Sequence, residues 1–161
     1  IRKETLDCVS ITFHLPEELE EKYQFTQGQY LTLRSLLGDE DVRRSYSICS
    51  GVDDGELRVA VKQVPGGLFS TYANEVLQEG DTLKVMTPMG RFNTPLSAEN
   101  SKHYVGVAAG SGITPILSII KSVMTKEPQS TFTLFYSNQK SSTVIFKEQI
   151  EDLKDLNMAK E

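Results

Sequence analysis

Alternating apolar and polar residues mark several short strands in the first part of the chain. Such alternation, with a period of two, is typical of strands that bury one face. The strand-like segments are, in chain order, residues 9–15, 29–34, 45–50, 56–64 and 82–86. In the clearest of them Leu57, Val59 and Val61 share one face. Short strands at this spacing predict an antiparallel barrel or sandwich, interrupted by one helix over about residues 70–78.

The pattern changes after about residue 101. An unbroken apolar run, which predicts a strand buried on both faces, is followed by apolar residues at helical spacing, a second strand and a second amphipathic helix. These segments are residues 104–109, 115–126, 131–136 and 146–153. The β-α-β-α order predicts the start of a doubly wound parallel sheet. We therefore expect two domains, residues 1–97 and 98–161, with the boundary in the segment 93–101.

Composition excludes several classes of function. The chain has 161 residues and a net charge of −5, with no basic stripe, so nucleic acid is not expected as a partner. No apolar run approaches the roughly 20 residues that span a membrane, and we see no signal peptide. Cys8 and Cys49 lack metal-ligand spacing, which predicts free thiols in a reducing cytoplasm. His14 and His103 stand alone in strand-like runs, so no metal site is expected.

Residues 44–47, Arg-Ser-Tyr-Ser, place a cation, an aromatic ring and two hydroxyls on one extended segment. On a strand, Arg44 and Tyr46 share one face, and Ser45 and Ser47 share the other. A guanidinium can bind a pyrophosphate through two hydrogen bonds, a phenol can lie flat against another ring system, and the Ser47 hydroxyl can reach a ring nitrogen. The segment favours a flavin nucleotide. The alternative is an exposed arginine beside a packed tyrosine.

Two glycine-containing turns precede predicted helices. In residues 65–71, Ser70 or Thr71 is the expected N-cap, and free N–H groups of the first helical turn can bind an anion. In residues 110–115, Gly-Ser-Gly-Ile-Thr-Pro, the turn follows a strand and opens a helix, which suits the pyrophosphate of a dinucleotide. There we expect Thr114 as the N-cap and Pro115 as the first helical residue. For both turns the alternative is a connection without a ligand.

These motifs, in this order, resemble the ferredoxin–NADP reductase family of flavoproteins. Its motifs Arg-x-Tyr-Ser, glycine before a helix-starting serine, and Gly-x-Gly-x-x-Pro are similar to residues 44–47, 67–70 and 110–115. The resemblance covers essentially the whole chain. It implies an antiparallel FAD-binding β-barrel followed by part of a doubly wound α/β nucleotide-binding domain. Segments 60–70, 86–92 and 108–115 are most similar to reductase components of phenylacetyl-CoA oxygenation, a part of bacterial phenylacetate degradation.

The resemblance also implies roles for individual residues. Tyr46 would stack on the isoalloxazine, Ser47 would hydrogen-bond near flavin N5, and Thr114 would lie where nicotinamide meets flavin; these three are the expected catalytic residues. Arg44 and Ser70 would hold the FAD phosphates. The residues expected to bind FAD or the nicotinamide nucleotide are Arg44, Tyr46, Ser47, Val61, Lys62, Gly67, Leu68, Phe69, Ser70, Gly110, Ser111, Gly112, Thr114, Pro115 and Lys140.

By resemblance, hydride passes from NAD(P)H to FAD, and single electrons then pass to an iron–sulfur centre of an oxygenase or a ferredoxin-type acceptor. NADPH is the favoured donor because residues 137–140, Ser-Asn-Gln-Lys, offer a cation and no carboxylate for the ribose. The rival interpretations are a stand-alone ferredoxin or flavin reductase, and a flavin-binding adaptor subunit that catalyses nothing.

The family's oxygenase reductases carry a plant-type [2Fe–2S] domain after the nucleotide domain. This chain begins with Ile1, contains no Cys-x4-Cys-x2-Cys run, and offers only two strands for its parallel sheet. We therefore expect a fragment of a longer protein, inactive in turnover by itself, with the cluster in a C-terminal domain outside it.

Overall fold

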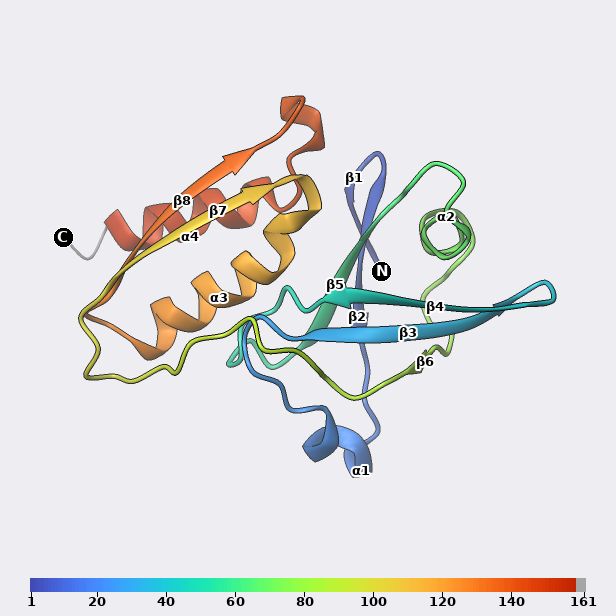
Figure 1. The fold of residues 1–161 in the computed structure, drawn as a ribbon, viewed down its shortest axis with the longest axis horizontal. Helices are drawn as coiled ribbons and strands as arrows, with labels where there is room; N and C mark the ends of the chain where they lie inside the picture. The colour runs from blue at the N-terminus through green and yellow to red at the C-terminus, as the bar shows by residue number, and fades with distance from the viewer. Residues whose placement is uncertain (159–161) are drawn as a thin grey trace.

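The computed structural model describes residues 1–158, with side chains described as far as Asp155. A mainly β part and an α/β part lie side by side (Figure 1). The elements of the first part are β1 (Arg2–Thr5), β2 (Cys8–Phe13), α1 (Glu17–Glu20), η1 (Glu21–Tyr23), β3 (Tyr30–Leu37), β4 (Glu40–Ser47), β5 (Leu57–Lys62), α2 (Leu68–Glu75) and β6 (Lys84–Val85). Those of the second part are β7 (His103–Ala109), η2 (Gly110–Gly112), α3 (Ile113–Lys126), β8 (Thr131–Ser137), η3 (Ser141–Thr143) and α4 (Lys147–Met158).

The first part contains two antiparallel three-stranded sheets, with strand orders β1-β2-β5 and β4-β3-β6. A bridge between Ile48 and Val59 joins the end of β4 to β5 and connects the two sheets. This arrangement confirms the antiparallel β architecture predicted from the alternation.

One strand boundary was predicted wrongly. The pattern placed a strand at residues 45–50, but β4 spans Glu40–Ser47. The first half of β4 is charged and exposed apart from Val42, and across the hairpin Arg34 Nε donates to Asp41 Oδ1 at 2.7 Å. Charged pairs of this kind stabilise a hairpin without producing an apolar alternation, so the pattern missed that half.

Strand β5 is buried on both faces and separates two hydrophobic cores. Val59 and Val61 face the barrel core, while Ala60 faces a second core, here called the shared core. The shared core joins Cys8, Cys49 and Ala60 of the first part to Ala108, Ile113, Ile116, Leu117, Ile120, Ile145 and Phe146 of the second. The two parts therefore pack against each other through apolar side chains.

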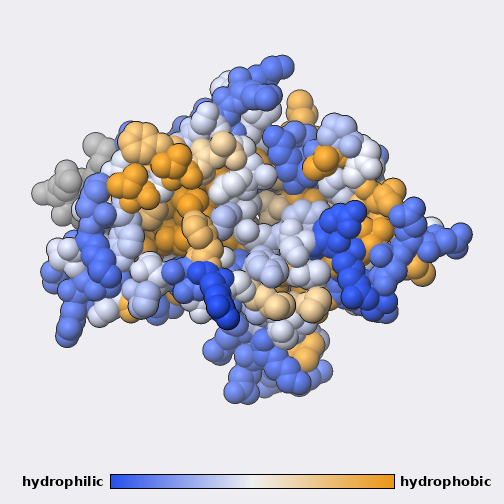
Figure 2. Space-filling model, in the orientation of Figure 1, coloured by the Kyte–Doolittle hydropathy of each residue, from blue (hydrophilic) through white to orange (hydrophobic). Residues whose placement is uncertain are grey.

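In the second part, β7 and β8 pair in parallel, as predicted, with His103 opposite Thr131 and Ala109 opposite Ser137. Residues of α3 and α4 pack on one face of this pair. The other face is open: Val105 is 60% exposed and Val107 is 74% exposed. Figure 2 shows apolar side chains gathered over β7 and β8. The prediction that residues 104–109 are buried on both faces is therefore wrong for the described residues.

Both helix starts lie earlier than predicted. Helix α2 has Gly67 as its N-cap rather than Ser70 or Thr71, and α3 has Gly112 rather than Thr114, so that Pro115 is its third residue. The hydroxyls bond locally instead: Ser70 Oγ donates to Gly67 O, and Thr114 Oγ1 donates to Ser111 O at 3.0 Å.

Buried polar side chains from both parts hold the connecting segment. Gln27 Nε2 of the barrel donates to Thr94 O at 2.6 Å. Three residues farther along, the N–H of Ser97 donates to the carboxylate of Glu127 at 3.2 Å. The connection is therefore held at two close points, one in each part of the molecule. The predicted boundary between residues 97 and 98 lies next to the second of these points.

Candidate functional site

The Arg-Ser-Tyr-Ser motif lies at the carboxyl end of β4, beside the first turn of α2. The Tyr46 ring is half-buried, with its centroid 5.6 Å from that of Phe69. Burial raises the pKa of Tyr46 to about 12, which keeps the phenol neutral at physiological pH. Arg44 is exposed, and its Nη1 donates to the carbonyl of Arg43 at 2.7 Å. No carboxylate of the described side chains forms an ion pair with Arg44, so its guanidinium can bind an anion.

The start of α2 offers backbone donors next to this motif. The N–H of Thr71 makes the first helical bond, to Gly67 O at 3.0 Å. The N–H groups of the preceding three helical residues therefore have no partner within the helix. Ser70 Oγ already accepts the N–H of Val64 at 3.0 Å, which closes the loop before the helix. In this structure the serine shapes the turn, and the backbone offers the anion-binding groups.

A free edge of β5 continues this surface. The carbonyl of Arg58 accepts the N–H of Cys49 at 2.8 Å, so the backbone of Arg58 faces the end of β4. Strand alternation places the N–H and carbonyl of Lys62 on that same edge, beyond the bridge to β4. The backbone of Val61 faces the opposite way, and its carbonyl accepts Asn74 Nδ2 at 3.0 Å. Val61 and Lys62 are both predicted to bind cofactor. Of the two, Lys62 has the backbone N–H and carbonyl on the edge that faces the flavin motif.

The second glycine turn lies at the carboxyl end of β7. Gly110 has a φ of +51°, in the left-handed region that favours glycine. Tyr136 OH of β8 donates to Gly110 O at 2.9 Å and accepts the N–H of Ile145 at 3.2 Å, which fixes the turn. No atom lies within 4 Å of the position that a Cβ would occupy on Gly110 or Gly112. The space beside the start of α3 is therefore open to a ligand.

The shared core connects the flavin motif to the nucleotide turn. Cys49 lies two residues after Ser47 and is fully buried in the same core as Ile113, the first residue of α3. Tyr46 and Ser47, the predicted catalytic residues of β4, are therefore linked through packed residues to the helix that carries Thr114. Whether Tyr46 and Thr114 meet at one reaction centre stays a prediction.

The remaining predicted binding residues occupy different surroundings. Phe69 is buried in the barrel core, whereas Leu68 is 44% exposed. Ser111 is exposed in the turn before α3. Lys140 is exposed between β8 and η3, and its carbonyl accepts Thr143 Oγ1 at 2.8 Å. The Lys140 ammonium has no ion-pair partner among the described side chains.

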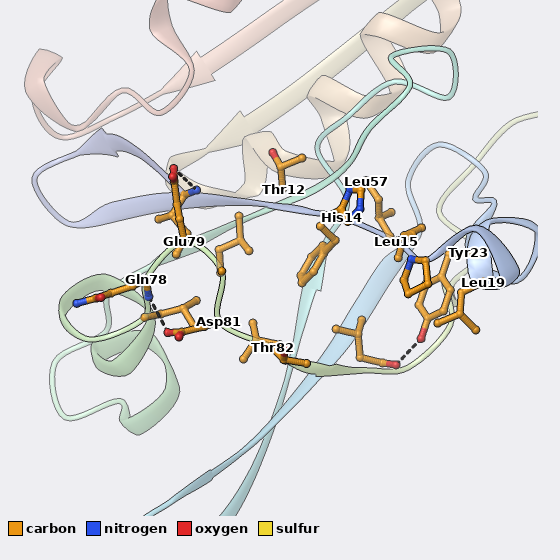
Figure 3. Close-up of a pocket in the computed structure, with 18 residues that line it drawn as sticks. Thr12, His14, Leu15, Leu19, Tyr23, Leu57, Gln78, Glu79, Asp81 and Thr82 are labelled. Carbon is orange, nitrogen blue, oxygen red and sulfur yellow. Dashed lines mark hydrogen bonds and ion pairs between the residues drawn. The ribbon is translucent and has the colours of Figure 1, made fainter.

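A cavity of about 660 Å³ lies elsewhere, at one end of the barrel. Figure 3 shows it between residues that follow β2, such as His14 and Leu15, and the segment that contains Glu79 and Asp81. None of the predicted site residues lines it. The cavity is therefore separate from the flavin motif and from both glycine turns.

The flavin motif and the start of α2 have groups that fit an FAD molecule. An unpaired cation and the free amides at the start of α2 suit a pyrophosphate, and a neutral, half-buried tyrosine suits the face of an aromatic ring. The described side chains include no group of three or more His, Cys, Asp or Glu residues that could hold a metal ion. The described helices include none long and apolar enough to cross a membrane.

Comparison with known families agrees with this arrangement. The family described as "Oxidoreductase FAD-binding domain" matches residues 2–94. The family described as "Oxidoreductase NAD-binding domain" matches residues 107–160. The chain belongs to the FAD- and NAD-binding, ferredoxin reductase-like family of oxidoreductases. Both the family and the fold predicted from the three motifs are thereby confirmed.

Two similar proteins are reductase or oxygenase components. The chain is 47% identical over 155 residues to one of the subunits of 1,2-phenylacetyl-CoA epoxidase from Escherichia coli, covering 96% of this chain and 44% of that protein. It is 38% identical to the ferredoxin reductase component of 3-ketosteroid-9-alpha-monooxygenase of Rhodococcus rhodochrous, covering 94% of this chain and 42% of that protein. The chain thus spans less than half the length of these two relatives.

Solved structures show the same fold. The FAD/NAD-binding domain of nitric oxide dioxygenase from Vibrio cholerae superposes with a TM-score of 0.84 at 23% identity, over 96% of this chain and 66% of that one. Phthalate dioxygenase reductase, described as transferring electrons from pyridine nucleotides to [2Fe–2S], superposes with a TM-score of 0.78 at 26% identity. That match covers 92% of this chain and 44% of the reductase.

Sequence reasoning missed two residues that shape the site. Tyr136 fixes the Gly110 turn, and Asn74 ties α2 to β5 by donating to Val61 O. Tyr136 is the next-to-last residue of β8 and Asn74 the next-to-last residue of α2, and neither position has a motif around it. The sequence signal for both is weak: a polar group inside a segment that otherwise packs.

Proposed function

We propose that this chain forms the FAD-binding barrel and the first part of the nucleotide-binding unit of an NAD(P)H-dependent reductase that serves a phenylacetyl-CoA oxygenase. The cofactors would supply the redox chemistry, in which a hydride moves from NAD(P)H to flavin and single electrons leave for an iron–sulfur centre. The 47% identity to the phenylacetyl-CoA epoxidase protein of Escherichia coli is the observation that carries this proposal. The rest of the relative's length, including any [2Fe–2S] domain, lies outside the match.

The protein's own contribution is binding and orientation. Arg44 and the first amides of α2 would hold the pyrophosphate, and Tyr46 would present its ring to the isoalloxazine. Ser47 would hydrogen-bond near flavin N5. The Gly110 turn and Thr114 would bind the nicotinamide nucleotide next to the flavin. Binding both cofactors there would exclude water and align the reacting atoms. No side-chain nucleophile is needed for this chemistry.

Arg44→Ala should weaken FAD binding about 10- to 100-fold, because it removes a charge-assisted contact worth roughly 1.5–3 kcal/mol. Titration of the apoprotein with FAD, followed by flavin fluorescence, measures the change. Arg43→Ala is the matched control: Arg43 is also exposed, lies on the opposite face of β4 and contacts Asp41 at 3.4 Å. Equal losses in the two variants would contradict the assignment of Arg44.

NADPH is the proposed donor, on the strength of the unpaired Lys140 ammonium. Lys140→Ala should lower kcat/KM for NADPH about tenfold, since a hydrogen bond to a charged group is lost, and should leave NADH use unchanged. Steady-state kinetics with both donors tests this. Lys147→Ala, which removes a cation paired with Glu151 at 3.9 Å, is the control. A wild-type protein that prefers NADH would refute the preference.

The proposed partner is an oxygenase or ferredoxin-type electron acceptor, and the proposed location is the cytoplasm. The buried, free thiols of Cys8 and Cys49 are compatible with a reducing compartment. Rapid reduction of the bound flavin by NADPH or NADH would exclude a non-catalytic adaptor. Electron delivery to an iron–sulfur acceptor, rather than to free flavin, would distinguish an oxygenase reductase from a stand-alone flavin reductase.

A further inference from the structure

Two hydrogen bonds join the loop after β4 to helix α3, and a third closes the loop itself. Lys121 Nζ donates to Asp54 Oδ2 at 2.7 Å, and the N–H of Val52 donates to Ser122 Oγ at 3.1 Å. The same Asp54 oxygen accepts the N–H of Gly51 at 2.9 Å. One carboxylate therefore closes the loop and holds the helix.

The loop continues directly from the flavin motif. After Ser47 the chain passes through residues 48–50, which are fully buried. The N–H of Cys49 donates to Arg58 O at 2.8 Å, so this stretch is fixed to β5. A shift of the loop would therefore also move the end of β4, because the three connecting residues are packed in the core.

At its other end the contact leads to the nucleotide turn. Helix α3 starts at Ile113, directly after Gly110–Gly112, and Lys121 lies eight residues farther on. That spacing is about 12 Å along a helix axis. Because α3 is one unbroken helix, a movement of the helix at Lys121 would also move its first turn.

Gly51 permits the close approach of loop and helix. A Cβ on Gly51 would lie 2.8 Å from Lys121 Cβ and 2.9 Å from Asp54 Oδ1. Both distances are too short for real contacts, so a larger residue would push the loop away from α3. The backbone and the ion pair thus define one separation between loop and helix.

We infer that the Asp54–Lys121 pair is a positioning clasp that sets the distance between the flavin motif on β4 and the nucleotide turn before α3. The inference rests on the proposed function. Hydride transfer needs reacting atoms about 3–3.5 Å apart, and a displacement of about 1 Å can cost about 100-fold in rate. Lys121 and Asp54 act through the backbone that they hold, since neither belongs to the predicted cofactor-binding set.

A second ion pair offers a matched control. Lys126 Nζ lies 2.8 Å from Asp53 Oδ1 and joins the same helix to the same loop. Its side chains are 47% and 41% exposed, whereas those of Lys121 and Asp54 are 17% and 23% exposed. Exposed ion pairs contribute little to structure. Loss of the Lys126–Asp53 pair should therefore have little effect, whereas loss of the less exposed Lys121–Asp54 pair should move the loop.

The experiment uses the full-length protein with FAD bound. Stopped-flow measurement gives the limiting rate of flavin reduction at saturating NADPH or NADH, whichever reduces the wild type faster. Lys121→Met should lower this rate about tenfold while the dissociation constants of FAD and donor change less than about twofold. Lys121→Arg should retain most of the rate. Gly51→Ala, which leaves every charge in place, should slow reduction as Lys121→Met does, and Lys126→Met should not.

Two results would overturn the clasp: an unchanged limiting rate in both Lys121→Met and Gly51→Ala, or an equal loss in Lys126→Met. A parallel loss of FAD affinity in Lys121→Met would also overturn it, since the residue would then support the fold rather than the geometry. If neither NADPH nor NADH reduces the wild-type flavin, the proposed function is wrong, and the clasp with it.

Discussion

Glu127→Ala should destabilise the protein by about 3 kcal/mol or more, because it leaves several buried donors without an acceptor. The Glu127 carboxylate is fully buried at the end of α3. It accepts Asn100 Nδ2 at 2.5 Å, Ser130 Oγ at 2.7 Å, Tyr104 OH at 2.9 Å and the N–H of Ser97 at 3.2 Å. Urea unfolding followed by circular dichroism measures the loss.

Glu127→Gln is the conservative control for this change. Glutamine keeps one acceptor oxygen, and the hydroxyls of Tyr104 and Ser130 can turn to accept its amide protons. The expected loss is about 1–2 kcal/mol. A glutamine variant as stable as the wild type, with a loss only in the alanine variant, would show that side-chain volume rather than the carboxylate's hydrogen bonds holds the connecting segment.

The same carboxylate makes stability depend on pH. Burial opposes ionisation, but hydrogen bonds from Asn100, Ser130, Tyr104 and the Ser97 backbone outweigh it and lower the pKa of Glu127 from 4.5 to about 2. A lowered pKa means that the unfolded chain binds the proton more tightly. The contribution is therefore complete above pH 4.5 and is lost as the pH falls towards 2. In the Glu127→Gln variant this part of the pH dependence should disappear.

Gly28→Ala should be more damaging still, with a loss of at least about 4 kcal/mol or failure to fold. Gly28 has a φ of +83°, and a Cβ there would lie 1.7 Å from Phe92 O. The clashing atom is a backbone oxygen, which cannot rotate away as a side chain could. It lies where the barrel contacts the start of the connecting segment. Expression yield and thermal unfolding measure the effect.

Gly80→Ala separates steric clash from backbone strain. Gly80 has a similar φ of +91°, but no atom lies within 4 Å of its Cβ position. A positive φ alone costs an alanine about 1–2 kcal/mol. If Gly28→Ala and Gly80→Ala lose equal stability, the close approach of residue 28 to the linker is not what makes glycine necessary there.

The fold was predictable from sequence where one face of an element is apolar. Helix α3 and the strands β2, β3 and β5 follow the alternation or helical spacing of their residues. Burial on both faces was assigned to the wrong strand. Residues 104–109 are apolar throughout yet half exposed in β7, while β5 is buried from Leu57 to Val61 although it contains Arg58. Hydropathy cannot show that Arg58 stacks over the ring of Phe146, 5.7 Å from its centroid.

The candidate site was predictable as a set of motifs, but its supporting contacts were not. Arg44 and Tyr46 follow a short pattern, and their roles there stay predictions. Glu127 and Asp54 lie far in sequence from the segments they hold, at separations that no local pattern encodes. The helix N-caps were misplaced for a related reason: Ser70 and Thr114 have hydroxyls suited to capping, but glycine occupies the cap and each hydroxyl bonds within its own turn.

The shared core also gives the molecule a chemical reporter of its own. Both of the chain's cysteines, Cys8 and Cys49, are sealed where the barrel meets the α/β part. Burial raises the pKa of each thiol to about 12, so neither offers a reactive thiolate at neutral pH. A thiol-modifying reagent can reach these cysteines only when the barrel and the α/β part separate. We therefore expect their rate of alkylation to report how often the barrel and the α/β part separate.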